Sequence, residues 1–161
     1  MTEEEFTNVV QHNSQRLYLI ALSFVKNTYD AEDILQNVFL KLWKYPKPFS
    51  DETHLDKWLT AVCVNESKNY IKHPFRQHIN IDDCVFVSSA EMDSSEKADL
   101  YRAVMQLSKK ERAVIHLFYY EDLSVKDIAK MLKMKESAVK TRLNRARNKL
   151  KERLGDAWID E

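Results

Sequence analysis

The sequence predicts an all-α protein with two small helical domains joined by a flexible linker, the second of which ends in a helix–turn–helix. Two observations lead to this fold class. Glycine occurs once in 161 residues, at Gly155, and a chain with so little glycine is poorly suited to the tight turns of β hairpins, which need positive φ. Hydrophobic residues make up 44% of the chain, enough for a buried core, and they recur at helical spacing.

The first predicted domain covers residues 1–76. Its second helix is expected to begin at Asp30, a residue type that favours the N-cap position, and to end before Pro46. Trp43 and Trp58 fall in the apolar register of their helices, so both are expected to be core residues. The expected helices cover residues 6–25, 30–44 and 55–72, with a polar loop at 50–54.

The second predicted domain covers residues 96–161 and follows an acidic linker at 77–95, which lacks hydrophobic periodicity. Ser108 and Ser124 each stand three residues before an acidic side chain, the arrangement of a helix N-cap with its capping box. Short connections separate the resulting elements, and the turn 133–135 joins the last two, as in a helix–turn–helix. The expected helices cover residues 96–107, 109–120, 124–132 and 136–153.

Several kinds of functional site are excluded by what the sequence lacks. A single glycine cannot form a glycine-rich phosphate loop. Cys63 and Cys84 lie far apart with no cluster of further ligands, and His116 on its apolar helix is expected to be buried rather than catalytic. We therefore expect no enzyme, no metal and no cofactor. The acidic start at 1–5 and the lack of an apolar stretch of ~20 residues predict a cytoplasmic protein with no membrane insertion.

Charge is unevenly distributed along a chain whose net charge is zero. Residues 77–100 carry a net charge of −5, whereas residues 101–154, with fifteen basic and six acidic side chains, carry +9. A strongly basic block in a neutral chain indicates an acidic partner, and nucleic acid is the first candidate.

The last predicted helix has two distinct faces. Val139, Leu143, Ala146 and Leu150 follow helical spacing and form an apolar stripe that faces the core. The opposite face carries side chains that can pair with base edges in the major groove or bind phosphates. A solvated basic helix is the alternative, but the position of this helix as the second of a helix–turn–helix favours DNA binding. The outward residues are Ser137, Lys140, Thr141, Asn144, Arg145 and Asn148.

Three segments resemble bacterial sigma factors. Leu123–Leu132 followed by Ser137–Leu150 resembles the domain that reads the promoter −35 element, and Ala31–Trp43 is similar to the segment that binds the clamp helices of RNA polymerase. Two domains with only a linker between them are similar to the extracytoplasmic-function, or group 4, sigma factors. The residues that fit the family's pattern around −10 recognition are Phe49, Leu55, Trp58, Leu59, Val62, Asn65, Asn69 and Lys72.

The resemblance implies a function and a set of partners. It implies a sigma factor that directs RNA polymerase core enzyme to promoter DNA, recognises the −35 and −10 elements, assists melting and is restrained by an anti-sigma factor. The loop Ser50–Lys57 would capture an unstacked base. The residues implied at the −35 element are Ser137, Lys140, Thr141, Asn144 and Arg145; those at the −10 element are Asn65, Lys68 and Asn69; and those at the polymerase are Asp33, Gln36 and Asn37.

Some residues depart from the family pattern. Lys133 stands where the family usually has glycine, and a lysine with positive φ there would be strained by about 1 kcal/mol. Lys135 replaces the usual Ser or Thr cap of the reading helix, and Asn37 stands where an acidic residue is typical.

A stand-alone helix–turn–helix transcriptional regulator is the alternative function. Its N-terminal domain would sense a signal or mediate dimerisation, and it would bind specific duplex DNA without polymerase. The matches at 31–43 and 58–72 count against it, because a sensing domain has no reason to carry them.

Overall fold

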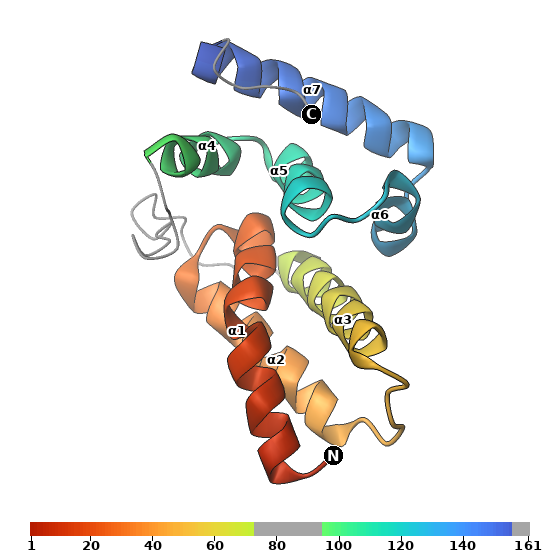
Figure 1. Cartoon of the computed structure of the whole chain (residues 1–161). Coiled ribbons are helices and arrows are strands. Elements are labelled where there is room, and N and C mark those ends of the chain that lie inside the picture. The colour runs from red at the N-terminus through yellow and green to blue at the C-terminus, as the bar shows by residue number, and fades with distance from the viewer. Residues whose placement is uncertain (73–94, 156–161) are drawn as a thin grey trace. The chain divides into compact units, whose positions relative to one another are not determined.

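The computed structural model describes residues 1–72 and 95–155, and within these ranges all regular structure is helical (Figure 1). The chain divides into two compact units: residues up to 72 belong to the first, and residues from 95 belong to the second. This confirms the predicted all-α fold with two helical domains. The predicted linker, apart from its last residue, lies outside the described residues.

The first unit is a bundle of the helices α1 (Glu3–Val25), α2 (Thr28–Lys44) and α3 (Glu52–Lys72). Each of them packs against the other two. All three bury apolar side chains in a shared core, which fixes the directions of their exposed faces. Fully or almost fully buried core residues include Leu17, Ile20, Ile34, Leu42 and Leu59.

All three helices of the first unit begin earlier than predicted, because other residues cap them; Thr2 caps α1, which begins at Glu3 and not at residue 6. The side-chain oxygen of Asn27 accepts a hydrogen bond from the backbone N–H of Asp30 at 3.0 Å. The prediction that Asp30 caps α2 is therefore wrong, and this residue is only 3% exposed. Similarly, Oδ1 of Asp51 accepts from the backbone N–H of His54 at 2.7 Å, so residues 52–54 of the predicted loop are helical. Both side chains satisfy first-turn N–H groups, as Asn and Asp do at N-caps.

The prediction that Trp43 is a core residue is also wrong, since this side chain is 51% exposed. Val38 and Leu42 belong to the buried stripe of α2. Trp43 directly follows Leu42 and is rotated from it by about 100° around the helix axis. That rotation places Trp43 at the edge of the buried face, where its ring meets Phe6 edge-on, with 5.0 Å between ring centroids. Trp58 is half-buried.

The second unit begins with α4 (Ser95–Met105) and α5 (Lys109–Ile115), and α5 continues as a π-helical turn at His116–Tyr120. The helices α6 (Val125–Leu132) and α7 (Glu136–Leu154) form the predicted helix–turn–helix. Ser108 and Ser124 cap α5 and α6 as predicted, each accepting a hydrogen bond from the backbone N–H three residues further on. Because α7 packs against α4, α5 and α6, its orientation within this unit is fixed.

Lys133 ends α6 with a left-handed backbone, at φ 55° and ψ 50°. This conformation lets the N–H of Met134 donate to the carbonyl of Ala129 at 2.9 Å, which closes the helix and turns the chain into α7. Since a side chain with a Cβ is strained there, we expect Lys133→Gly to raise the free energy of unfolding by about 0.5–1 kcal/mol. Thermal unfolding of the two proteins measures the difference. A less stable glycine variant would contradict this reading of the turn.

His116 is buried as predicted, with 1% exposure, and its Nδ1 has no hydrogen-bond partner among the described residues. Burial lowers its pKa to about 4, against roughly 6.5 for an unfolded chain. Between these values the unfolded chain binds the extra proton. We therefore expect the second unit to lose roughly 3 kcal/mol of stability as the pH falls from about 6.5 to about 4. Unfolding measured across this range checks it: His116→Phe should remove most of the pH dependence, and an unaltered dependence would exclude His116 as its source.

Candidate functional site

The exposed face of α7 is the first candidate surface. The predicted apolar stripe of this helix is buried, since Val139, Leu143, Ala146 and Leu150 are at most 1% exposed. On the opposite side α7 presents a polar and basic face of a kind that can enter a major groove. All of its predicted outward residues are exposed: Ser137, Lys140, Thr141, Asn144, Arg145 and Asn148.

Lys149, a further basic residue of α7, is used inside the second unit. Its Nζ lies 2.8 Å from Oε1 of Glu111, whose side chain is 8% exposed. The same carboxylate oxygen accepts a hydrogen bond from the hydroxyl of Ser108 at 2.6 Å. Burial alone would raise the pKa of Glu111, but the bonds from Lys149 and Ser108 lower it below its ordinary value. This ion pair therefore ties α7 to the start of α5 and sets the rotation of α7.

Arg147 performs a similar task at the π-helical turn. Its Nε donates to the hydroxyl oxygen of Tyr119 at 2.7 Å, and its guanidinium carbon lies 5.5 Å from the ring centroid of Phe118, within range of a cation–π contact. The sequence analysis gave Arg147 no role. The available signal was its spacing of four residues from Leu143 and three from Leu150, which places it beside the buried stripe.

The helix before α7 and the turn between them add positive charge to the same unit. Lys126, Lys130, Lys133 and Lys135 are all exposed. Lys135 is the N-cap of α7 and makes no side-chain capping bond, so a cation stands beside N–H groups that can also bind an anion. Such a group of lysines can hold the phosphates on either side of a groove while α7 enters it.

The exposed face of α3 is the second candidate surface. Asn65 and Asn69 are exposed and one helical turn apart, and Lys68 beside them is half-buried. Close to the start of the same helix, three half-buried aromatic rings contact one another. The ring centroids of Tyr45 and Phe49 are 5.2 Å apart, and that of Trp58 lies 4.8 Å from the first and 5.5 Å from the second. Amides, an ammonium group and aromatic rings are the groups that bind single-stranded nucleic acid.

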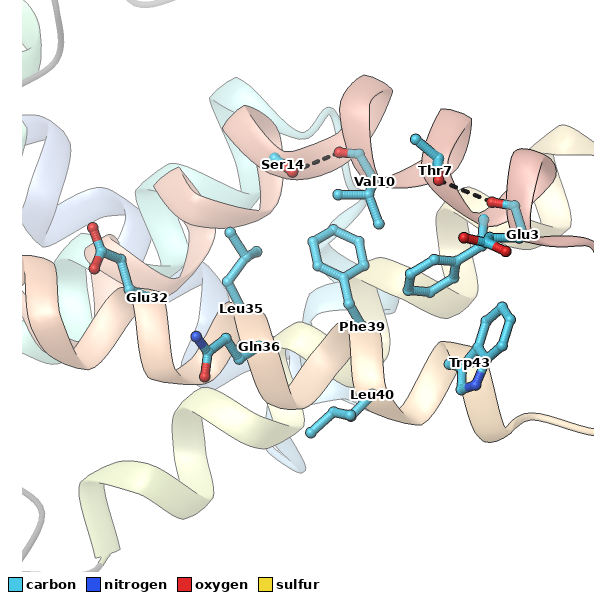
Figure 2. Close-up of a pocket in the computed structure, with 11 residues that line it drawn as sticks. Glu3, Thr7, Val10, Ser14, Glu32, Leu35, Gln36, Phe39, Leu40 and Trp43 are labelled. Carbon is cyan, nitrogen blue, oxygen red and sulfur yellow. Dashed lines mark hydrogen bonds between the residues drawn. The ribbon is translucent and has the colours of Figure 1, made fainter.

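The third candidate surface lies on α2. Asp33 and Gln36 are exposed and Asn37 is half-buried. Beside Gln36, an open groove of about 900 Å³ runs between α1 and α2 (Figure 2). Leu40 and Trp43 line this groove and are 53% and 51% exposed. Large apolar side chains that lie exposed beside a groove can serve as anchors for another protein.

Sequence reasoning missed the groove, because it assigned Trp43 to the core. Its apolar lining residues are Phe6, Val10, Leu35, Phe39, Leu40 and Trp43. Figure 2 shows Val10, Leu35 and Phe39 between the two helices. We refer to this surface as the α1–α2 groove.

The described ranges contain neither a membrane-spanning helix nor a cluster of metal ligands. No helix within residues 1–72 or 95–155 is long and apolar enough to cross a membrane. In the same ranges, no group of three or more His, Cys, Asp or Glu side chains is placed to hold a metal ion.

Comparison with known proteins gives matches for both units. A family model described as sigma-70 region 2 matches residues 9–74, and one described as sigma-70, region 4 matches residues 97–150. The RNA polymerase sigma factor SigV of Bacillus subtilis is 26% identical over 146 residues, which cover 90% of this chain and 88% of SigV. The ECF RNA polymerase sigma factor SigW of the same organism is 23% identical over 170 residues, covering 96% and 91%.

Solved structures show the same similarity. The sigma factor RpoE from Bartonella quintana, in complex with the anti-sigma factor NepR, matches with a TM-score of 0.75 and 25% identity, covering 96% of this chain and 99% of RpoE. CnrH, in complex with the cytosolic domain of CnrY, matches with a TM-score of 0.58 and 24% identity, covering 97% and 90%.

Proposed function

The chain belongs to the extracytoplasmic-function group of sigma-70 factors, and we propose that three exposed surfaces divide its work. As a sigma factor it directs RNA polymerase to specific promoters in transcription initiation. One observation supports the proposal: the same chain has an exposed face on α7 that can read DNA and the exposed, apolar α1–α2 groove.

The outward face of α7 reads the −35 element. Lys140 and Arg145 pair with guanine edges or bind phosphates, and Asn144 is suited to bidentate pairing with adenine. The hydroxyls of Ser137 and Thr141 complete the face. The burial of the opposite stripe supports this assignment, because the second unit has no other way to orient α7 than with these residues outward.

The face of α3 binds the melted −10 strand. Asn65 and Asn69 bond to base edges that become accessible once the strands separate, and Lys68 pairs with a phosphate. An unstacked base is captured by the segment Ser50–Lys57, which adjoins the ring of Trp58. The carboxylate of Asp51 is engaged as the cap of α3, which directs it toward backbone N–H groups and away from DNA phosphates.

The exposed side of α2 binds the polymerase core enzyme. Asp33, Gln36 and Asn37 supply polar contacts, and the α1–α2 groove beside Gln36 supplies an apolar one. Interfaces of this kind draw most of their binding energy from a few buried aromatic and apolar anchors with polar groups around them. Trp43 is the anchor that the groove offers.

The proposal extends to organisation and partners. A region 2-like domain covers residues 1–76, a linker covers 77–95, and a region 4-like domain covers 96–161. An anti-sigma factor is a further partner, since the similar RpoE is bound to one. The chain has no catalytic step of its own, because binding energy at unstacked bases drives melting, and it acts in the cytoplasm, where polymerase and promoters are.

The test is whether the purified chain and RNA polymerase core enzyme together start transcription at defined promoters. The sigma factor should bind core enzyme and produce transcripts that core enzyme alone does not make. A chain that binds specific duplex DNA but not core enzyme would instead be a stand-alone regulator, and the proposal would fail.

A further inference from the structure

Tyr70 connects α3 to α2 through two carboxylates. Its one hydroxyl proton is shared in a three-centre hydrogen bond: the phenol oxygen lies 2.8 Å from Oδ1 of Asp30 and 3.1 Å from Oδ2 of Asp33. Tyr70 is 4% exposed and Asp30 is 3% exposed, whereas Asp33 reaches solvent. The two aspartates are one helical turn apart, so a single buried phenol lies against both of them. Neither contact was predicted from the sequence.

The hydroxyl of Tyr70 remains a hydrogen-bond donor, because its phenol stays protonated. Burial and the neighbouring Asp30 carboxylate raise the pKa of Tyr70 far above its ordinary value, so the hydroxyl keeps its proton. A hydrogen bond from a neutral hydroxyl to a carboxylate is shorter and stronger than one between neutral groups. The buried member, Asp30, stands in the first turn of α2, where the helix dipole favours a negative charge. It therefore holds the phenol in place.

The weaker arm of this shared bond restricts the side chain of Asp33. An aspartate on a helix surface can adopt several rotamers, and a bond to a fixed donor selects one of them. We propose that Tyr70 is a positioning residue for polymerase binding: its hydroxyl, shared with Asp30, fixes the carboxylate of Asp33 in one rotamer on the exposed side of α2. The inference rests on the proposed function, in which Asp33 contacts core enzyme. Because Tyr70 directly follows Asn69, the helix that binds the −10 strand also supports the polymerase contact.

The test compares four proteins for their affinity for core polymerase: the native chain, Tyr70→Phe, Asp33→Ala and the double variant. Tyr70→Phe keeps the buried ring and removes only the hydroxyl. We expect it to bind core enzyme about 3-fold more weakly, the cost of selecting again one of roughly three rotamers of Asp33. In the Asp33→Ala background the same change should have no further effect, because Tyr70 acts through Asp33. Tyr120→Phe, on an exposed tyrosine of the second unit, is the matched control and should bind as the native chain does.

The outcomes separate this inference from the proposed function. If Asp33→Ala weakens binding and Tyr70→Phe does not, or if Tyr70→Phe weakens binding equally with and without Asp33, the positioning role is wrong and the polymerase contact stands. If Asp33→Ala has no effect, the assignment of Asp33 fails and the inference fails with it. Should Tyr70→Phe unfold below the assay temperature, the four affinities are compared at a lower temperature at which thermal unfolding shows all four proteins to be folded.

Discussion

The Trp43→Ala variant is expected to bind RNA polymerase core enzyme about 30-fold more weakly than the native chain, the loss typical of an interface hot spot of about 2 kcal/mol. The reason is that Trp43 is a large side chain, half in contact with the α1–α2 groove and half exposed to a partner. Burying an indole against a partner removes much apolar surface from water at a low cost in conformational entropy. Equilibrium titration of labelled core enzyme measures the effect.

The matched control is His12→Ala. His12 is an exposed residue of α1 that also carries a ring, and it does not line the groove. It should leave the affinity for core enzyme unchanged, and thermal unfolding should show that both variants remain folded. Equal losses in the two variants, or no loss in Trp43→Ala, would remove the groove from the polymerase interface.

The double variant Asn144→Ala, Arg145→Ala should lower initiation from a cognate promoter by about 100-fold, because each base or phosphate contact contributes about 1–3 kcal/mol. Both side chains are exposed on α7 and lie opposite its buried stripe. Their removal costs the second unit the 3.4 Å hydrogen bond from Arg147 to Oδ1 of Asn144 and leaves the buried stripe in place. Transcription assays with core enzyme measure the rate, and the affinity of the variant for core enzyme should not change.

Lys151→Ala is the control for charge alone. Lys151 is an exposed basic residue of the same helix, near its C-terminal end and away from the N-terminal turns that enter a groove. We expect its loss to reduce initiation only slightly and equally at all promoters. A reduction as large as that of the double variant would mean that α7 contributes non-specific charge and no base recognition.

Much of the fold could be predicted from local sequence signals. The buried residues Val139, Leu143 and Ala146 recur at the period of a helix, and this period is set by the backbone alone. The serine caps at Ser108 and Ser124 were equally predictable, because a cap forms between residues three positions apart. The same period gave the exposed face of α7 correctly.

The parts that were not predicted depend on contacts between distant residues. Asp30 is of a residue type that often caps helices. Its side chain is instead buried, where it accepts a hydrogen bond from the hydroxyl of Tyr70, forty positions later. Arg147 was given no role, because its bond to Tyr119 of the π-helical turn joins residues 28 positions apart. Trp43 is exposed because it lies at the edge of the face that α2 buries, whereas Leu42 lies within that face. Helical periodicity cannot distinguish the edge of a buried face from its centre, because contacts between helices determine which residues at the edge are covered.

The central claim is that α7 and α3 recognise separate promoter elements. Sequencing the 5′ ends of transcripts made on genomic DNA of the source organism, by core enzyme with the native chain, tests it most directly when two variants are run beside it. Asn144→Ala, Arg145→Ala should relax only the upstream element shared by the starts, and Asn65→Ala, Asn69→Ala only the downstream one. Start sites without shared elements, or variants that relax both elements together, would contradict the claim.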